Sequence, residues 1–164
     1  MTTETKKNTN NILQLISINW KLEIEALDGR AYIDAKNIFK SAIAGDFKNL
    51  EINQADTSTA ETLVDVREMI GDGKFFKIFS EITDDLEKIF LTSRQIIRFC
   101  EKYPGWLLPS GIFTLFPTKV ESEYSVVCVQ SYADELIFFR LGYGHIFKGS
   151  DRHRVVYRQF SLAV

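Results

Sequence analysis

This chain of 164 residues is poor in the residues that build metal centres and disulfide scaffolds, with two cysteines and two histidines. Cys100 and Cys128 each lie within an apolar run. Free cysteine is among the most buried residue types, so we predict two reduced, structural thiols. A chain of this length can bury one sizeable core without disulfides or a metal ion.

Long apolar runs are missing as well. No window of the sequence approaches the roughly 20 apolar residues of a membrane span. The start of the chain is polar and lacks the apolar segment of a signal peptide. We therefore predict a cytoplasmic protein with no membrane contact. Residues 1–11 should form a disordered leader, and residues 12–164 a single domain.

The composition is that of an ordinary globular protein, with 45% hydrophobic and 26% charged residues. The net charge of -2 disfavours a wholesale nucleic-acid binder. The charge is uneven, because residues 140–164 carry five basic side chains and one acidic one, a local charge of +4. The rest of the chain then carries -6. An acidic body with a basic end predicts local anion binding, or docking onto an acidic surface.

The N-terminal part predicts a β-hairpin. Apolar residues alternate with polar ones over Ile12–Leu27, which is typical of a half-buried strand. The apolar face would hold Ile16, Ile18, Trp20, Leu22 and Ile24. Asp28-Gly29 favours a two-residue turn, and the returning strand would be Arg30–Ile33. Asp34 can then cap a helix over Ala35–Ala44.

The middle of the chain predicts short helices. Residues 61–70 fit a helix and, less cleanly, a strand, and both interpretations stay open. Lys74–Ile82 repeats apolar residues at helical spacing, and Thr83 looks like the start of a further helix. Thr92 and Gln95 form a capping-box pattern that opens another helix, which Pro104-Gly105 would end.

After this helix the apolar period changes from that of a helix to that of a strand. Short connections favour antiparallel neighbours, so we predict a meander of four strands: Ile112–Phe116, Tyr124–Gln130, Leu136–Leu141 and His153–Phe160. Pro117 lacks an N–H, which favours an edge or an end of its strand there. The predicted fold class is α+β, with an N-terminal β-hairpin, a helical middle and a C-terminal antiparallel β-meander packed on helices.

Three segments, Phe90–Leu107, Gly111–Phe116 and Arg152–Val156, together resemble a group of small proteins from minimal-genome, candidate-phylum bacteria. The shared pattern is a capped Gln-Ile-Ile-x-Phe-Cys helix, an aromatic β-meander and a terminal Tyr-Arg-His-Arg-x-Val strand. This chain has Asp151 where that pattern has tyrosine. The resemblance spans residues 84–160 and implies membership of the group, but no activity.

Catalytic and metal sites have few candidate residues. Cys100 and Cys128 could pair with His145 or His153 for nucleophilic catalysis. Cys100, however, lies late in its predicted helix, where the helix dipole disfavours a thiolate. The same four residues lack the closely spaced ligand pairs of a structural zinc site. We therefore predict no cofactor and no metal.

The chain ends in a strand-like segment rich in arginine. Side chains alternate across a strand, so Arg152, Arg154 and Arg158 would share one face with Val156, and Tyr157 would lie on the other. Such arginines either bind an anionic partner or protect an exposed sheet edge.

These patterns predict a non-enzymatic protein-interaction module that binds an acidic protein surface. The predicted partner-binding residues are the basic side chains of the C-terminal part, Arg152, Arg154, Arg158, Arg140 and Lys148. A nucleic-acid-associated regulator is the alternative, and a small hydrolase-like enzyme comes third. Replacing the three strand arginines by glutamine should abolish partner capture with little loss of thermal stability.

Overall fold

The computed structural model describes residues 11–27, 58–108, 112–120, 122–132, 135–141 and 144–160, with backbone alone at 120, 132 and 135–141. Several predicted features lie outside the described residues: nearly all of the leader, the Asp28-Gly29 turn, the strand Arg30–Ile33 and the helix Ala35–Ala44.

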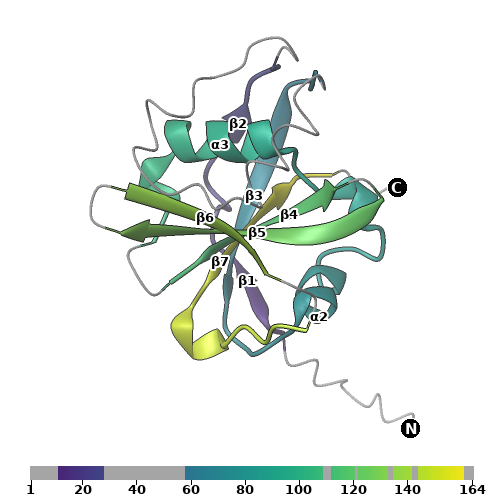
Figure 1. The fold of residues 1–164 in the computed structure, drawn as a ribbon, viewed down its shortest axis with the longest axis vertical. Coiled ribbons are helices and arrows are strands. Elements are labelled where there is room, and N and C mark those ends of the chain that lie inside the picture. Colours follow the sequence, from purple (N-terminus) through teal and green to yellow (C-terminus); the bar gives the residue numbers. More distant parts are fainter. Residues whose placement is uncertain are drawn as a thin grey trace, which may run out of the picture.

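The described residues contain one mixed sheet of seven strands, in the order β1-β3-β7-β4-β5-β6, with β2 also paired to β3 (Figure 1). All neighbouring strands are antiparallel except β4 and β7, which are parallel. With its few short helices, this sheet confirms the α+β class. The strands are β1 Leu13–Leu15, β2 Leu22–Ile24, β3 Thr62–Met69, β4 Thr114–Val120, β5 Glu123–Tyr132, β6 Glu135–Leu141 and β7 Arg154–Arg158.

The first predicted strand is in fact two strands separated by a bulge. Leu15 pairs with Arg67 and Leu22 with Val64, so an advance of seven residues from β1 to β2 matches an advance of only three residues along β3. The chain between β1 and β2 therefore carries four extra residues. The expectation that Ile18 and Trp20 face the core is wrong, because these side chains are 72% and 65% exposed.

Ser17 explains why the strand breaks here. Its Oγ accepts a hydrogen bond from the backbone N–H of Val66 over 2.9 Å, in the place where a strand would offer a carbonyl. Serine side chains compete with the ladder for backbone partners in this way. Ser17 is itself buried, so the bulge is anchored to the middle of β3.

Within the ambiguous residues 61–70, which fitted a strand less cleanly than a helix, Thr62–Met69 form β3. The strand pairs with β1 and β2 on one side and with β7 on the other. Val64 and Val66 point into the core on one face of the sheet. Leu22 and Ile24 lie in the same cluster, so the N-terminal strands share the main core.

Of the three helices predicted within the described residues, two are confirmed. Helix α2 covers Phe75–Ser80, and α3 covers Ser93–Lys102 with the predicted capping box between Thr92 and Gln95. The helix expected after Thr83 is only a 3₁₀ turn, η2, at Leu86–Lys88. Two further 3₁₀ turns follow in the chain, η3 at Pro104–Trp106 and η4 at Gly149–Asp151.

Three of the four C-terminal strands form the predicted meander, β4–β5–β6. The fourth, β7, lies between β3 and β4 instead of beside β6. Its residues Val155, Val156 and Tyr157 are all buried, and a strand buried on both faces belongs inside a sheet. The interpretation of its arginines as protection of a sheet edge is therefore wrong. Strand β4 pairs with β7 only at Thr114 and Leu115, so Pro117 lies beyond the paired part of that edge, as its missing N–H favours.

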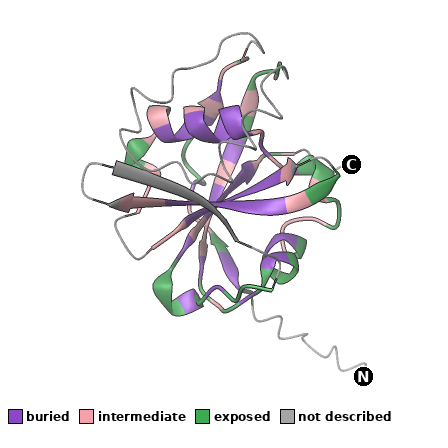
Figure 2. Ribbon diagram, in the orientation of Figure 1, coloured by how far each residue is buried: buried purple, intermediate pink, exposed green. Residues whose placement is uncertain are grey.

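Apolar side chains cover both faces of the sheet, and the buried residues follow its centre (Figure 2). One cluster joins the sheet to α3 and contains Cys100, Phe116 and Val156. The other joins the opposite face to α2 and contains Cys128, Phe79 and Tyr157. In the described part of the chain, no helix is long and apolar enough to cross a membrane.

Candidate functional site

Strand β7 sends its arginines to different places. Arg154 and Arg158 flank the buried Val156 on the face that α3 covers, as their spacing predicted. Tyr157 lies in the cluster of the other face, where its hydroxyl accepts a hydrogen bond from Arg67 Nε. Arg152 precedes the strand and closes η4 with a left-handed backbone, at a φ of 52°.

Arg154 stacks on Trp106 of η3. Its Cζ lies 5.6 Å from the centre of the indole, and its Nη1 donates to the Trp106 carbonyl over 2.8 Å. Burial lowers the pKa of Arg154, and the carboxylate of Glu68 partly opposes this effect. Glu68 is the cross-strand partner of Arg154 and also forms an ion pair of 2.7 Å with Arg152.

Trp106 also meets Trp20, edge to face, with ring centres 6.0 Å apart. These contacts connect the bulge, η3 and β7. We call Ile18, Trp20, Trp106, Arg152 and Arg154 the Trp–Arg surface. Arg152 is its most accessible cation, with 69% of its side chain exposed.

The sequence patterns predicted only the arginines of this surface as functional residues. Ile18 and Trp20 match the alternation of a buried strand face, so the pattern assigned them to the core. The one available signal was Ser17-Ile-Asn-Trp20, in which two small polar residues that favour turns interrupt the apolar run.

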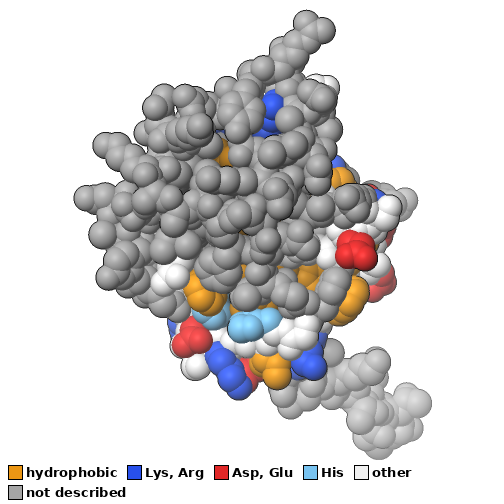
Figure 3. Space-filling view, in the orientation of Figure 1, with side chains coloured by type: hydrophobic (Ala, Val, Ile, Leu, Met, Phe, Trp, Pro, Cys, Tyr) orange, Lys and Arg blue, Asp and Glu red, His pale blue; other side chains and the backbone are white. Residues whose placement is uncertain are grey.

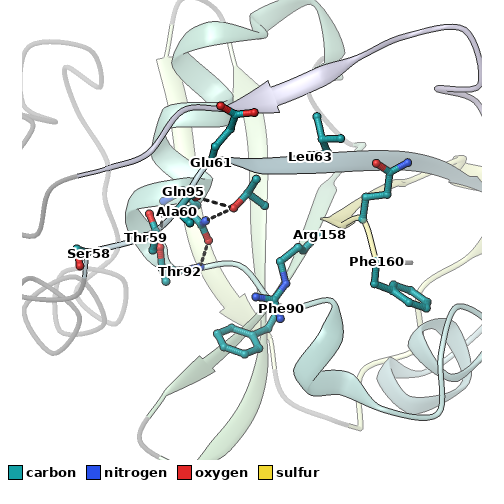
Figure 4. A pocket seen from close by; sticks show the side chains of 12 residues that line it. Ser58, Thr59, Ala60, Glu61, Leu63, Phe90, Thr92, Gln95, Arg158 and Phe160 are labelled. Carbon is teal, nitrogen blue, oxygen red and sulfur yellow. Dashed lines mark hydrogen bonds between the residues drawn. The ribbon is translucent and has the colours of Figure 1, made fainter. Parts of the chain in front are cut away.

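Arg158 lies at the other end of β7, in the wall of a cavity of about 790 Å³ (Figure 4). Its Nε donates to the Lys88 carbonyl over 2.9 Å, and its Nη2 donates to the Glu87 carbonyl. The guanidinium lies over the ring of Phe90, 5.1 Å from its centre. The arginine is thus fixed against η2 and the residues that follow it.

Lys148 lies apart from the strand arginines, beside η4. Its Nζ is 3.4 Å from Asp72, which also accepts a hydrogen bond from the backbone of Gly149. That backbone hydrogen bond is the main cause of a lowered pKa for Asp72. Figure 3 shows histidine, basic and apolar side chains together at this end of the molecule. The side chain of Arg140 lies outside the described residues.

His153 is buried with both ring nitrogens occupied. Its Nδ1 accepts a hydrogen bond of 2.9 Å from the N–H of Phe113, and its Nε2 faces Asp151 at 3.5 Å. Burial lowers the pKa of His153, with Asp151 acting against it, so the ring is neutral near pH 7. Because Nδ1 accepts the N–H of Phe113, the proton of the neutral ring is on Nε2, and neither nitrogen is available as a general base.

The cysteines and histidines considered for catalysis or zinc do not come together as a set. Cys100 and Cys128 lie in the clusters on opposite faces of the sheet, and burial raises the pKa of both thiols. His145 lies against Phe147, with ring centres 4.7 Å apart. Over the described ranges, no three residues of the types His, Cys, Asp and Glu are placed to hold a metal ion.

Comparison with protein-family models, curated proteins and solved structures finds no match for this chain. The likeness to small bacterial proteins over residues 84–160 therefore stays a prediction.

Proposed function

We propose that this chain is a protein-binding module that docks an acidic partner through the Trp–Arg surface. The observation that carries the proposal is the exposure of Ile18 and Trp20, 72% and 65%, on a bulge anchored to the sheet. Their exposure cannot be ascribed to a mobile tail, because the Ser17 hydroxyl and the Ile16 N–H both bind the backbone of Val66.

The chemistry of the surface is that of a protein-protein contact. Tryptophan and arginine are the residue types most enriched among the side chains that dominate binding energies. Here Trp20 packs edge to face on Trp106, and Arg154 lies over the Trp106 ring, so little rotamer entropy is lost when a partner covers them.

The charges of the surface favour an acidic partner. Both charged residues of the surface, Arg152 and Arg154, are cationic, and both interact with the carboxylate of Glu68. Arg152 has a planar group of donors that matches carboxylates in pairs, and most of its side chain is exposed. A partner with acidic and apolar side chains would contact both the arginines and the indoles of this surface.

The test is capture from an extract of the native host on four immobilised forms of the protein. These are the wild type, Trp20→Ser, Arg152→Gln and a matched control, Phe76→Ser. Phe76 is 58% exposed on α2, away from the Trp–Arg surface. The retained proteins and nucleic acids are identified in parallel.

We expect an acidic protein that the wild type and Phe76→Ser retain and that both surface variants lose. The same set of proteins on all four forms would contradict the proposal. Retention of nucleic acid alone, lost steeply with rising salt, would favour the nucleic-acid-associated regulator instead.

A further inference from the structure

We propose that the cavity beside Arg158 is a second binding site, which takes a carboxylate carried on an apolar body. The site is separate from the Trp–Arg surface and does not depend on it. The cavity lies where the end of β7 and the start of β3 meet the start of α3 (Figure 4). Its volume of about 790 Å³ is within the range of about 300–1,000 Å³ that is typical of small-molecule pockets.

The wall that carries Phe90 is held in place before any ligand arrives. The N–H of Arg158 donates to the Ile89 carbonyl over 3.0 Å, and the N–H of Leu91 donates to the Pro117 carbonyl over 2.8 Å. The Thr118 hydroxyl donates to the Leu91 carbonyl, also over 2.8 Å. Both flanks of Phe90 are thus tied to the sheet, and the pocket is preorganised.

Arg158 has donors to spare after its internal contacts. Its Nε and Nη2 each donate to a carbonyl of η2, at Lys88 and Glu87. Nη1 has no hydrogen-bond partner within the described part of the chain, and Nη2 keeps its second N–H. These two atoms form the end of the guanidinium fork, the edge that binds a carboxylate in a bidentate manner.

The opposite wall supplies hydroxyl groups. Gln95 is not free to bind a ligand, because its side chain bridges the N–H of Thr92 and the hydroxyl of Thr62. The Oγ1 of Thr59 is buried and has no hydrogen-bond partner among the described residues. It lines the cavity, and its hydrogen-bonding capacity is unused among the described residues.

The remaining lining decides the class of ligand. Phe90, Phe160 and Leu63 provide apolar surface. The one acidic residue of the lining, Glu61, is exposed and points away from Arg158 (Figure 4). A single guanidinium suits one negative charge better than the two of a phosphate group. An apolar monocarboxylate satisfies both halves of the pocket, and either a free acid or the C-terminus of a peptide would present it.

The test is titration of the ¹⁵N-labelled full chain, followed by NMR, with two pairs of probes. Phenylacetate is compared with phenylacetamide, and N-acetyl-Gly-Phe with its C-terminal amide. We expect each acid to bind at least about tenfold more tightly than its amide, because only the carboxylate accepts two hydrogen bonds from Arg158. The signals of Arg158 Nε–H, Thr92 and Phe160 should move.

The two pairs also separate the sources of the carboxylate. Tighter binding of the peptide acid assigns the site to a peptide C-terminus, and tighter binding of phenylacetate assigns it to a free acid. Equal binding of acid and amide, binding of inorganic phosphate as tight as that of the acids, or signal changes confined to other regions would each overturn the proposal. The comparison of acid with amide uses the wild-type protein, so its outcome does not depend on whether any variant folds.

Arg158→Lys keeps the charge but loses the fork, and we expect it to weaken binding of the acids about tenfold. Arg152→Gln is the matched control and should leave their affinity unchanged. The tryptophan fluorescence should stay constant throughout, because both tryptophans lie in the Trp–Arg surface. A failure of this site is therefore distinguishable from a failure of the proposed protein-binding function.

Discussion

Arg154 lies over the indole of Trp106, 5.6 Å from its centre, and donates to the carbonyl of the same residue over 2.8 Å. One arginine of the C-terminal strand thus fixes the turn that carries Trp106. Trp106 in turn supports Trp20 edge to face. The basic strand and the aromatic bulge are parts of one structure, although about 130 residues separate them in the chain.

Arg154→Gln should lower the free energy of unfolding by about 1.5–3 kcal/mol, because it removes a charge-assisted hydrogen bond and a stacked contact from a half-buried site. Arg152→Gln, the matched control, should change it by less than about 1 kcal/mol, since its ion pair is largely exposed. Urea denaturation measures both. Equal effects would contradict a structural role for Arg154. The expectation that all three strand arginines are dispensable for stability is thus replaced by a distinction among them.

Ser17→Ala should destabilise the fold by about 1–3 kcal/mol, because it leaves the buried N–H of Val66 without its partner. It should also weaken partner capture, since the bulge that presents Trp20 loses its anchor. Ser80→Ala, at an exposed serine of α2, is the control and should change neither property. Full capture by a destabilised Ser17→Ala protein would show that the anchor is not needed for binding.

Thr92→Ala should cost about 1 kcal/mol of stability, the usual effect of removing a helix N-cap. Both halves of the capping box are present, with Gln95 N donating to Thr92 Oγ1 and Thr92 N donating to Gln95 Oε1. Thr92→Ser keeps the hydroxyl and should retain most of the stability. Thermal unfolding followed by circular dichroism compares the two variants, and an equal loss in both would argue against the cap.

Stability should fall as the pH drops below about 6.5, the ordinary pKa of histidine. Burial lowers the pKa of His153 in the folded state, so the unfolded chain binds the proton more readily. The contribution of neutral His153 to stability is complete above the pKa of this histidine in the unfolded chain. As the pH falls, the contribution declines until the pH is below the lower pKa of the folded state. Asp151 opposes this shift, and His145 adds to it.

His153→Asn tests this titration, because asparagine can still accept the N–H of Phe113 but does not titrate. Denaturant unfolding at a series of pH values from 5 to 8 should show a flatter profile for the variant than for the wild type. Parallel profiles would assign the pH dependence to other groups.

Much of the fold follows from local patterns in the sequence. The α3 capping box, the α2 helix and the β4–β5–β6 meander each depend on contacts between neighbours in the chain. The sequence prediction placed β7 beside β6, because it assumed that strands joined by short connections are neighbours and did not consider burial on both faces of β7. Val155, Val156 and Tyr157 are consecutive apolar residues, a pattern that fits a strand in the interior of a sheet, and the structure buries all three.

The candidate sites were harder to predict, because they depend on contacts between distant segments. The pairing of Arg154 with Trp106 and that of Arg158 with Phe90 join β7 to segments some 50 or more residues away. The exposure of Trp20 depends on a bulge whose partner lies on β3. An alternating pattern does not show which of its apolar residues a bulge turns outward.

The most direct test of the protein-binding account is ¹⁹F NMR of the chain labelled with 5-fluorotryptophan, with and without the acidic protein captured from the host. The chain has two tryptophans, so two signals are expected, and Trp106→Phe assigns them. The account predicts that the Trp20 signal shifts or broadens when the partner is added. Binding of the partner with both signals unchanged would contradict it.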